Sequence, residues 1–290
     1  MNEPVHRAGV VALLGRPNAG KSTLLNRLLG WKLAIVTAKP QTTRSRLLGI
    51  LTLPHAQVAF VDTPGLHESS KPLNVALNEI VDGVADGCDA ALLLVDGRVG
   101  WGQPETALVA RLQEKGRPLV VVANKSDLPG AADDGWPEDA PEPMRTSALT
   151  GAGVPALLEK ILAILPKSPQ LYPPDELSDR PLRFLGAELV REAAFEVLQQ
   201  EIPYSLAVEV EEWDEKRPDL VRVRANLLIE RTSQKQIVIG RNGRVIKEIG
   251  TRARRQLEIL VDRKVHLELW VKVEPKWSSR PKRLKSLGYS

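Results

Sequence analysis

The first 165 residues alternate short apolar runs with segments whose apolar residues recur at helical spacing. Apolar runs that predict strands span residues 10–14, 47–53, 58–61, 90–95 and 119–123. The last two are continuously apolar, which is typical of strands buried on both faces of a parallel sheet. Helical spacing is found in residues 22–29, 73–85, 105–115 and 154–165. This alternation predicts an α/β domain with a mixed, mostly parallel sheet and flanking helices.

A proline-rich stretch separates this pattern from a different one. Residues 165–181 hold five prolines and little periodicity, so we expect a first domain at 1–168, a linker at 169–181 and a second domain at 182–290. The second pattern predicts helices at 182–200 and 244–261 and strands at 205–211, 220–229 and 265–273. Residues 234–239 are rich in β-branched side chains and fit a strand as well as a helix. Residues 129–143 are expected to form a loop.

The charge is divided as sharply as the pattern. The whole chain carries +4, but residues 1–181 carry −2, residues 182–230 carry −5 and residues 231–290 carry +11. A local basic excess of this size predicts contact with phosphates, either of nucleic acid or of an anionic membrane surface. No apolar run approaches a membrane span, the N-terminus lacks a signal-peptide pattern, and the single cysteine permits a reducing compartment. We therefore expect a cytoplasmic monomer, with a peripheral inner-membrane pool as an alternative.

The strongest motif lies between the first expected strand and the first expected helix. It has the form G-x-x-x-x-G-K-[ST] and consists of Gly15, Arg16, Pro17, Asn18, Ala19, Gly20, Lys21, Ser22 and Thr23. In this context the backbone N–H groups cradle the phosphates of a nucleotide, Lys21 reaches the β- and γ-phosphates, and Ser22 ligates Mg²⁺. The sequence therefore predicts a P-loop.

Two further segments predict that the base is guanine. Asn124, Lys125, Ser126 and Asp127 follow the strand expected at 119–123, and a carboxylate there accepts two hydrogen bonds from the guanine edge. Adenine does not present those donors, so Asp127 would select GTP. Ser147, Ala148 and Leu149 follow the next strand and would meet the base from the other side.

A third segment predicts the switch and the rest of the metal site. Asp62, Thr63, Pro64, Gly65 and Leu66 follow the strand at 58–61, which places Asp62 near Mg²⁺ and the Gly65 amide near the γ-phosphate. Upstream, in residues 39–44, Thr43, or with less support Thr42, would complete a metal shell of Ser22, Thr43 and Asp62. We assign catalysis to Lys21, Thr43 and Gly65.

The basic C-terminal region contains a G-x-x-G loop between two apolar stretches. It consists of Gly240, Arg241, Asn242 and Gly243, with Arg244 and Lys247 beginning the helix that follows. This arrangement resembles the loop of KH domains, in which about four nucleotides of a single strand lie against the glycines. The basic side chains would neutralise the phosphates.

Taken in order, these motifs resemble the Era-type GTPases of the translation-factor class over essentially the whole chain. The residues that carry the resemblance are GRPNAGKSTLLN, PQTTR, DTPG, NKSD and SALTG, followed by the KH-like segment. The resemblance implies a type II KH domain with the order α-β-β-α-α-β, which makes 234–239 a helix. It further implies GTP hydrolysis linked to maturation of the 30S subunit and binding of small-subunit ribosomal RNA near its 3′ end. Asn18 resembles an asparagine that holds K⁺ in some relatives.

One position departs from the wider Ras-like pattern. Leu66 stands where those proteins have a glutamine that orients the attacking water, so we expect slow intrinsic GTP turnover to GDP and phosphate. Arg44 or Arg46 offers positive charge, but a loop arginine is more often exposed and solvated. Two rivals stay open: a GTPase domain that acts only as a ligand-stabilised scaffold, and membrane recruitment through the +11 segment.

The remaining candidates favour structural roles. Cys88 adjoins an apolar run and is expected to be a small buried hydrophobe. His6, His55, His67 and His266 share no metal-ligand spacing. Trp270 lies in an alternating strand and is expected to pack. The tail at 276–285, which contains Trp277, either contacts RNA or frays into solvent.

Overall fold

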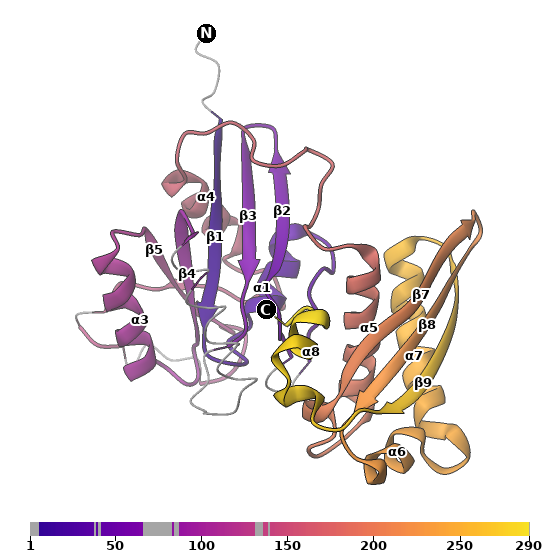
Figure 1. The fold of residues 1–290 in the computed structure, drawn as a ribbon. Coiled ribbons are helices and arrows are strands. Elements are labelled where there is room, and N and C mark those ends of the chain that lie inside the picture. The colour runs from indigo at the N-terminus through magenta and orange to yellow at the C-terminus, as the bar shows by residue number, and fades with distance from the viewer. Residues whose placement is uncertain are drawn as a thin grey trace. The chain divides into compact units, whose positions relative to one another are not determined.

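The computed structural model describes residues 6–37, 39, 42–65, 83, 87–130, 136–138 and 140–289. They form two compact units (Figure 1). The first unit comprises Met1–Ala34 and Thr43–Asp179, and the second comprises Ile35–Thr42 and Arg180–Ser290. Segment 35–42 therefore belongs by its contacts to the C-terminal unit, although it lies within the N-terminal half of the sequence.

The first unit is built on a six-stranded sheet in the order β2-β3-β1-β4-β5-β6. Its strands are β1 (Arg7–Gly15), β2 (Leu47–Leu53), β3 (Ala56–Asp62), β4 (Ala90–Asp96), β5 (Leu119–Asn124) and β6 (Met144–Arg145). Every neighbouring pair is parallel except β2 with β3. The predicted mixed, mostly parallel sheet is confirmed.

Three described helices flank this sheet: α1 (Lys21–Leu29), α3 (Gln103–Glu114) and α4 (Val154–Ile164). The apolar face of α3 packs on β1 and β4, where it joins a core cluster that includes Cys88. Cys88 is buried as expected. The helix predicted at 73–85 lies almost entirely outside the described residues.

The parallel strands bring the candidate motifs to one edge of the sheet. Gly15 ends β1, Asp62 ends β3, and Asn124 ends β5. Leu13 is paired with Asp62, and Asp96 with Asn124. Because the carboxyl ends of parallel strands share an edge, loops far apart in sequence converge there.

The proline-rich stretch runs along the outer strands of the first unit. The buried side chain of Gln57 on β3 accepts hydrogen bonds from the backbone N–H groups of Leu171, at 2.8 Å, and Tyr172, at 2.9 Å. The Ile50 amide on β2 donates to the carbonyl of Leu177 at 3.0 Å. Backbone groups that proline-rich sequence cannot pair within itself are thereby satisfied by the sheet edge.

The second unit has the order expected from the family resemblance. Helix α5 (Leu182–Val197) is followed by β7 (Ala207–Arg217), β8 (Leu220–Ile229), α6 (Thr232–Ile239), α7 (Arg244–Val261) and β9 (Lys264–Val273). The sheet order is β7-β8-β9, with β8 antiparallel to β7 and parallel to β9. Helices α5 and α7 pack together and cover one face of this sheet.

Two local features explain why the sequence pattern did not define the structure of residues 234–239 or the end of β7. Residues 234–239 lie in helix α6 and not in a strand, because Gln234 in the first turn accepts a hydrogen bond from the Arg231 amide at 2.9 Å and caps the helix. Strand β7 extends past the predicted end at 211, since a register shift between Val210 and Glu212 interrupts the alternation there.

The C-terminal tail is folded and neither frayed nor arranged for stacking. Trp277 has no exposed surface, and its indole N–H donates to the carbonyl of Ser205 at 3.0 Å. Helix α8 (Pro281–Ser286) follows it, and Arg283 forms ion pairs with Glu209 at 2.7 Å and Glu274 at 2.8 Å. The expectation that the tail frays was wrong, and the buried Trp277 cannot stack on a base, whereas contact of the tail's basic side chains with RNA stays a prediction. Within the described part of the chain, no helix is long and apolar enough to cross a membrane.

Candidate nucleotide-binding site and nucleic-acid interface

The P-loop joins β1 to α1 in a conformation that requires glycine. Gly20 caps α1 with φ +96°, and a Cβ atom there would lie 2.2 Å from the side-chain nitrogen of Asn124. The loop therefore turns into the helix with its first N–H groups free for an anion. Lys21 closes the loop, because its Nζ donates to the carbonyls of Gly15 at 3.0 Å and Arg16 at 3.1 Å.

Burial makes Lys21 an unusually weak base. Only 6% of the residue is exposed, and this burial lowers its pKa from 10.5 to about 8, although the nearby Asp62 carboxylate opposes the shift. A bound polyphosphate would place negative charge near Nζ and would thereby stabilise the charged form of Lys21.

Ser22, Thr43 and Asp62 form one hydrogen-bonded cluster. The Ser22 hydroxyl donates to Asp62 Oδ2 at 2.6 Å and lies 2.9 Å from the Thr43 hydroxyl, which is 3.4 Å from the same carboxylate oxygen. The other oxygen, Asp62 Oδ1, is buried, and none of the described residues hydrogen-bonds it. Burial raises the pKa of Asp62, while the Lys21 charge and these hydrogen bonds oppose that rise.

This cluster fits Mg²⁺. One carboxylate and two hydroxyls are hard oxygen ligands, and Mg²⁺ is commonly held by few protein ligands together with substrate phosphates and water. The unpartnered Asp62 oxygen is the group that a cation would satisfy. Thr42 is directed elsewhere, since its hydroxyl donates to the Lys39 carbonyl at 2.7 Å. The structure therefore brings Thr43, and not the alternative Thr42, to the cluster.

The segment after β3 passes directly against the P-loop. A Cβ atom on Gly65 would lie 2.6 Å from the backbone nitrogen of Pro17, so only glycine permits this approach. The Thr63 hydroxyl donates to the Leu13 carbonyl at 2.7 Å and fixes the start of the segment. The expectation for Leu66 lies outside the described residues.

Asn124 ties the expected base-binding loops to the P-loop. Its side-chain N–H donates to the Ala19 carbonyl at 2.9 Å, and its Oδ1 accepts from the Ala148 amide at 3.0 Å and the Thr146 hydroxyl at 3.3 Å. The residue is 1% exposed. Asp127, in contrast, is exposed and has its carboxylate available to a base.

The serine of the 147–149 segment closes its own loop. Ser147 is buried, and its Oγ accepts from the Thr150 amide at 3.0 Å. Leu149 is 68% exposed. The structure therefore offers the backbone of this loop and the Leu149 side chain, more than the Ser147 hydroxyl, to a ligand.

Sequence reasoning missed several residues that hold these loops. Asp96 at the end of β4 lies 2.7 Å from Lys125 Nζ and 3.0 Å from Arg98. Partial burial would raise the Asp96 pKa, but hydrogen bonds from Arg98 and Lys125 outweigh it and lower the pKa to about 2. Arg16 is paired with the buried Glu105 of α3 at 2.5 Å. The position of Asp96 directly after a buried parallel strand was the signal available in the sequence.

The expectation that Arg44 and Arg46 are exposed, solvated loop residues is wrong for Arg44. Arg44 has no exposed surface, whereas Arg46 is half-buried. Both the stem and the guanidinium of Arg44 are therefore withdrawn from water.

The G-x-x-G loop lies between α6 and α7, as the KH resemblance implied. Gly240, Asn242 and Gly243 have φ values of +73°, +54° and +73°. A Cβ atom on Gly243 would meet nothing within 4 Å, so the backbone faces open space. Arg241, Arg244 and Lys247 are exposed. The loop thus presents an uncovered backbone beside three cationic side chains.

Comparison with known proteins identifies both domains. A family model described as "50S ribosome-binding GTPase" matches residues 10–125, and a KH-domain model matches residues 201–278. GTPase Era of Nitratidesulfovibrio vulgaris (strain DP4) is 43% identical over 100% of this chain and 99% of its own length. The chain belongs to the GTPase Era family. GTPase Era of Leuconostoc citreum is 40% identical, again over 100% of this chain and 99% of its own.

Two solved Era structures share the fold of this Era-family GTPase. A crystal structure of Era in complex with MgGDPNP and nucleotides 1506–1542 of 16S ribosomal RNA has a TM-score of 0.90 and 37% identity, covering 98% of this chain and 99% of that one. An Aquifex aeolicus Era variant bound to GDP·AlF4⁻ gives the same values. The G domain and KH domain predicted from the motifs are thereby confirmed.

Proposed function

We propose that this chain binds GTP with Mg²⁺, hydrolyses it slowly, and binds single-stranded small-subunit ribosomal RNA near its 3′ end during 30S assembly. The observation that carries the nucleotide half is the double hydrogen bonding of Asn124. It joins the P-loop to the 146–148 loop, so that phosphate and base contacts are built as one site. The relatives bound to MgGDPNP and to the 16S fragment support the assignment.

Each candidate residue of the first unit has a place in this proposal. The backbone N–H groups of the 15–23 loop, in which Pro17 has none, bind the phosphates, Lys21 neutralises the β- and γ-phosphates, and Asp127 reads guanine. Ser22, Thr43 and Asp62 would hold Mg²⁺, which supplies charge neutralisation of the transferred phosphate when bound. The Gly65 amide bonds the γ-phosphate. Asn18, exposed with φ +63°, is the residue that would contact K⁺.

Segment 35–42 supports the further proposal that nucleotide state controls RNA affinity. Ile35 lies in the core of the second unit, and the Val36 amide donates to Glu192 on α5 at 2.8 Å. Arg191 on the same helix donates to the Thr42 carbonyl at 2.5 Å. The segment is thus held by the helix that begins the KH unit.

The residues on either side of this segment are held in the first unit. Asn26 on α1 accepts from the amides of Leu33, at 2.9 Å, and Ala34, at 2.8 Å. Thr43 is hydrogen-bonded to Ser22 in the expected metal cluster. A change at Thr43 on GTP binding or hydrolysis is therefore transmitted through one peptide bond to a residue held by α5.

Two further properties belong to this proposal. The chain works as a cytoplasmic monomer, and the +11 charge of residues 231–290 gives a contact with anionic membrane as the competing use of the basic surface. RNA is favoured over lipid because the basic residues Arg241, Arg244 and Lys247 surround an uncovered G-x-x-G backbone, which suits a strand better than a plane.

Calorimetry of RNA binding tests the proposal. A 16S 3′-end fragment is titrated into the nucleotide-free, GDP-loaded and GTP-analogue-loaded chain, and affinities that differ by about 5- to 150-fold are expected. Equal affinities in the three states would contradict coupling, and multiple turnover of GTP distinguishes an enzyme from a ligand-stabilised scaffold. Absence of RNA binding in all states would contradict the assignment to RNA.

A further inference from the structure

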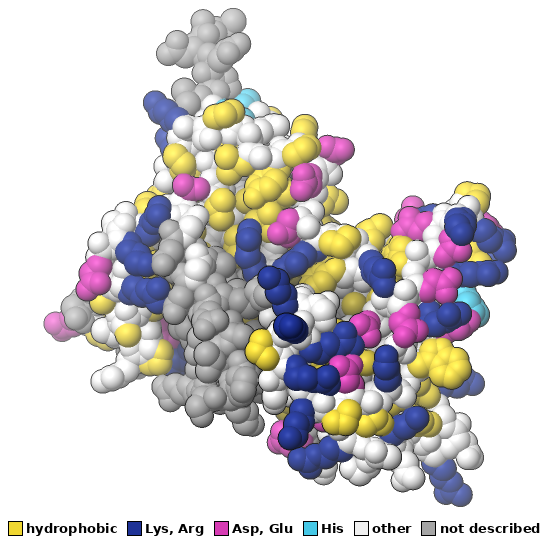
Figure 2. Space-filling view, in the orientation of Figure 1, with side chains coloured by type: hydrophobic (Ala, Val, Ile, Leu, Met, Phe, Trp, Pro, Cys, Tyr) yellow, Lys and Arg dark blue, Asp and Glu magenta, His cyan; other side chains and the backbone are white. Residues whose placement is uncertain are grey.

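The face of the KH sheet that points away from α5 and α7 carries an alternating row of polar and aromatic side chains. Odd-numbered positions of β8 and β9 point into the core, so the even-numbered ones lie on the opposite face. On β9 these outward positions are Lys264, His266, Glu268, Trp270 and Lys272, and on β8 they include Arg222, Arg224 and Asn226. Figure 2 shows basic, acidic and hydrophobic side chains gathered over the strands of this unit. We call this surface the outer sheet face.

Two cavities adjoin along this face. One has a volume of about 700 Å³ and is lined at the start of β9 by Lys264 and His266; it reaches around this edge strand to Arg254 and Glu258 of α7. The other, of about 580 Å³, is lined by Trp270 and Lys272 and by Lys235 of α6. Both include Arg224 and Glu268, so together they form one groove along β8 and β9. From position 264 to 272 a strand spans about 26 Å, which is enough for several nucleotides.

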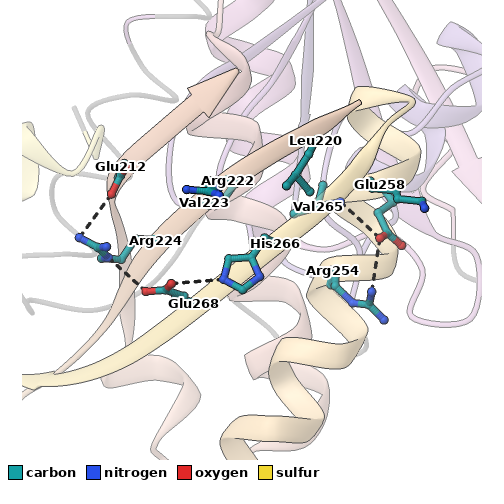
Figure 3. Close-up of a pocket in the computed structure, with 11 residues that line it drawn as sticks. Glu212, Leu220, Arg222, Val223, Arg224, Arg254, Glu258, Val265, His266 and Glu268 are labelled. Atoms are coloured by element: carbon teal, nitrogen blue, oxygen red, sulfur yellow. Dashed lines mark hydrogen bonds and ion pairs between the residues drawn. The ribbon is translucent and has the colours of Figure 1, made fainter. Parts of the chain in front are cut away.

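The carboxylates in the middle of the groove are engaged by neighbouring side chains. Arg224 is paired with Glu212 and with Glu268, each at 3.3 Å, and His266 lies 3.2 Å from the other oxygen of Glu268. Figure 3 shows these four side chains in a row across the strands. Arg224 offsets part of the charge of the two carboxylates, which weakens the negative field that would repel a phosphate.

The cations at the two ends of the groove are not used in this way. Among the described residues, no ion pair is formed by Arg222 or Lys264 at one end, nor by Lys235 or Lys272 at the other. All four side chains are exposed. The groove therefore carries unpaired positive charge at both ends, separated by a middle in which Arg224 offsets the two carboxylates only in part.

Trp270 lies beside the second pair of cations and is 61% exposed. The expectation that it packs in the sheet was wrong, because its even-numbered position points it outward while Leu269 and Val271 join the core. An exposed indole costs hydration free energy and gains nothing from the fold. Flanked by unpaired lysines, it has the composition of a base-stacking platform.

We propose that the outer sheet face is a second RNA contact, separate from the G-x-x-G loop, in which a base stacks on Trp270. The phosphates on one side of that base contact Lys235 and Lys272. The phosphates further along the RNA contact Lys264 and Arg222. Stacking on an indole tolerates any base, so this contact extends the bound length without adding sequence specificity. It goes beyond the proposed binding at the G-x-x-G loop.

The affinity of the full-length chain for a twelve-nucleotide single-stranded RNA tests the proposal. Trp270→Ala is expected to weaken binding about 5- to 100-fold, as loss of one base–aromatic stack does, and Trp270→Phe to restore most of it. Ile259→Ala is the matched control, because Ile259 is 74% exposed on α7 of the same unit, outside the groove. Replacing Lys264 and Lys272 together by Gln should reduce the dependence of log affinity on log salt by about 1.4.

Three outcomes would overturn this inference. RNA affinity unchanged in Trp270→Ala is one, and a Phe variant that binds no better than the Ala variant is the second. The third is a loss confined to vesicles containing anionic phospholipid, which would assign the face to membrane. The inference fails alone if Gly243→Asp weakens RNA binding and Trp270→Ala does not. If the wild-type chain binds no RNA, the proposed function fails with it.

Discussion

The side-chain amide of Asn124 donates a hydrogen bond to the carbonyl oxygen of Ala19 at 2.9 Å, joining the end of β5 to the middle of the P-loop. The same side chain accepts from the Ala148 amide, so one buried residue sets the spacing of three loops. Asp127 of the same motif is exposed and can meet a base. The P-loop, the motif that begins at Asn124 and the 146–148 loop are therefore joined by direct hydrogen bonds.

Asn124→Ala should lower both stability and nucleotide affinity. It leaves the Ala19 carbonyl and the Ala148 amide without partners in a buried site, which costs about 1–3 kcal/mol of unfolding free energy. Chemical denaturation measures that loss, and calorimetry with GDP is expected to show at least a tenfold weaker Kd. Glu114→Ala, at an exposed residue at the end of α3, is the control and should change neither quantity substantially.

Lys21→Ala should abolish GTP turnover, and the wild-type chain should show proton uptake on binding. The Lys21 pKa of about 8 means that the nucleotide-free protein loses this proton as the pH rises through 8. A bound polyphosphate favours the ammonium form, so affinity should fall above pH 8 and binding should take up a proton there. Calorimetry in buffers of different ionisation enthalpy checks this. Binding without proton uptake between pH 8 and 9.5 would contradict the role given to Lys21.

Asp127→Asn should weaken selection of guanine and favour xanthine nucleotides. The carboxamide replaces one acceptor by a donor, which repels the N1–H or N2–H₂ group of guanine and suits the xanthine carbonyl. Because Asp127 is exposed, the melting temperature should not change. Competition between GDP and XDP is the measurement, and retained preference for GDP would remove the base-reading assignment.

Arg191→Met should uncouple RNA affinity from nucleotide state. Arg191 is fully buried and donates to the Thr42 carbonyl, so methionine preserves the packing of the stem but removes the hydrogen bond to the residue next to Thr43. The ratio of RNA affinities with GTP analogue and with GDP should move toward one. Arg183→Met is a matched control on the same helix, since Arg183 donates to the Val210 carbonyl within the KH unit. An unchanged ratio in Arg191→Met would show that coupling does not run through this residue.

Gly243→Asp should weaken RNA binding and leave GTP binding unchanged. The space around this glycine is open, so the substitution adds a negative charge beside the bound RNA without a steric clash. Its φ of +73° adds some strain, which Gly243→Ala reproduces without charge. Filter binding to 16S 3′-end RNA should show a clearly larger loss for Asp than for Ala. Equal affinity in Gly243→Asp and the wild type would count against the KH loop as the binding element.

Motifs with strong local geometry could be predicted well from the sequence. The P-loop, the segment beginning at Asp62 and the segment beginning at Asn124 each follow a buried strand, and parallel strands must bring such segments to one edge. Ambiguity arose where local propensity competed with context. The β-branched residues 234–239 form helix α6 because Gln234 caps it, and the alternation of β7 is interrupted by a bulge.

What the sequence by itself determined was the set of loops and their chemistry, since glycine positions, strand patterns and charge are local properties. Only the tertiary structure decided which side chains are buried and which are exposed. In the folded chain, Arg44 and Trp277 are buried and Trp270 is exposed. Asn124 belongs to the nucleotide motif and also links the loops around it through hydrogen bonds. The tertiary structure also assigned residues 35–42 to the C-terminal unit. These outcomes depend on which surfaces of distant segments meet, and a local pattern contains no information about its distant neighbours.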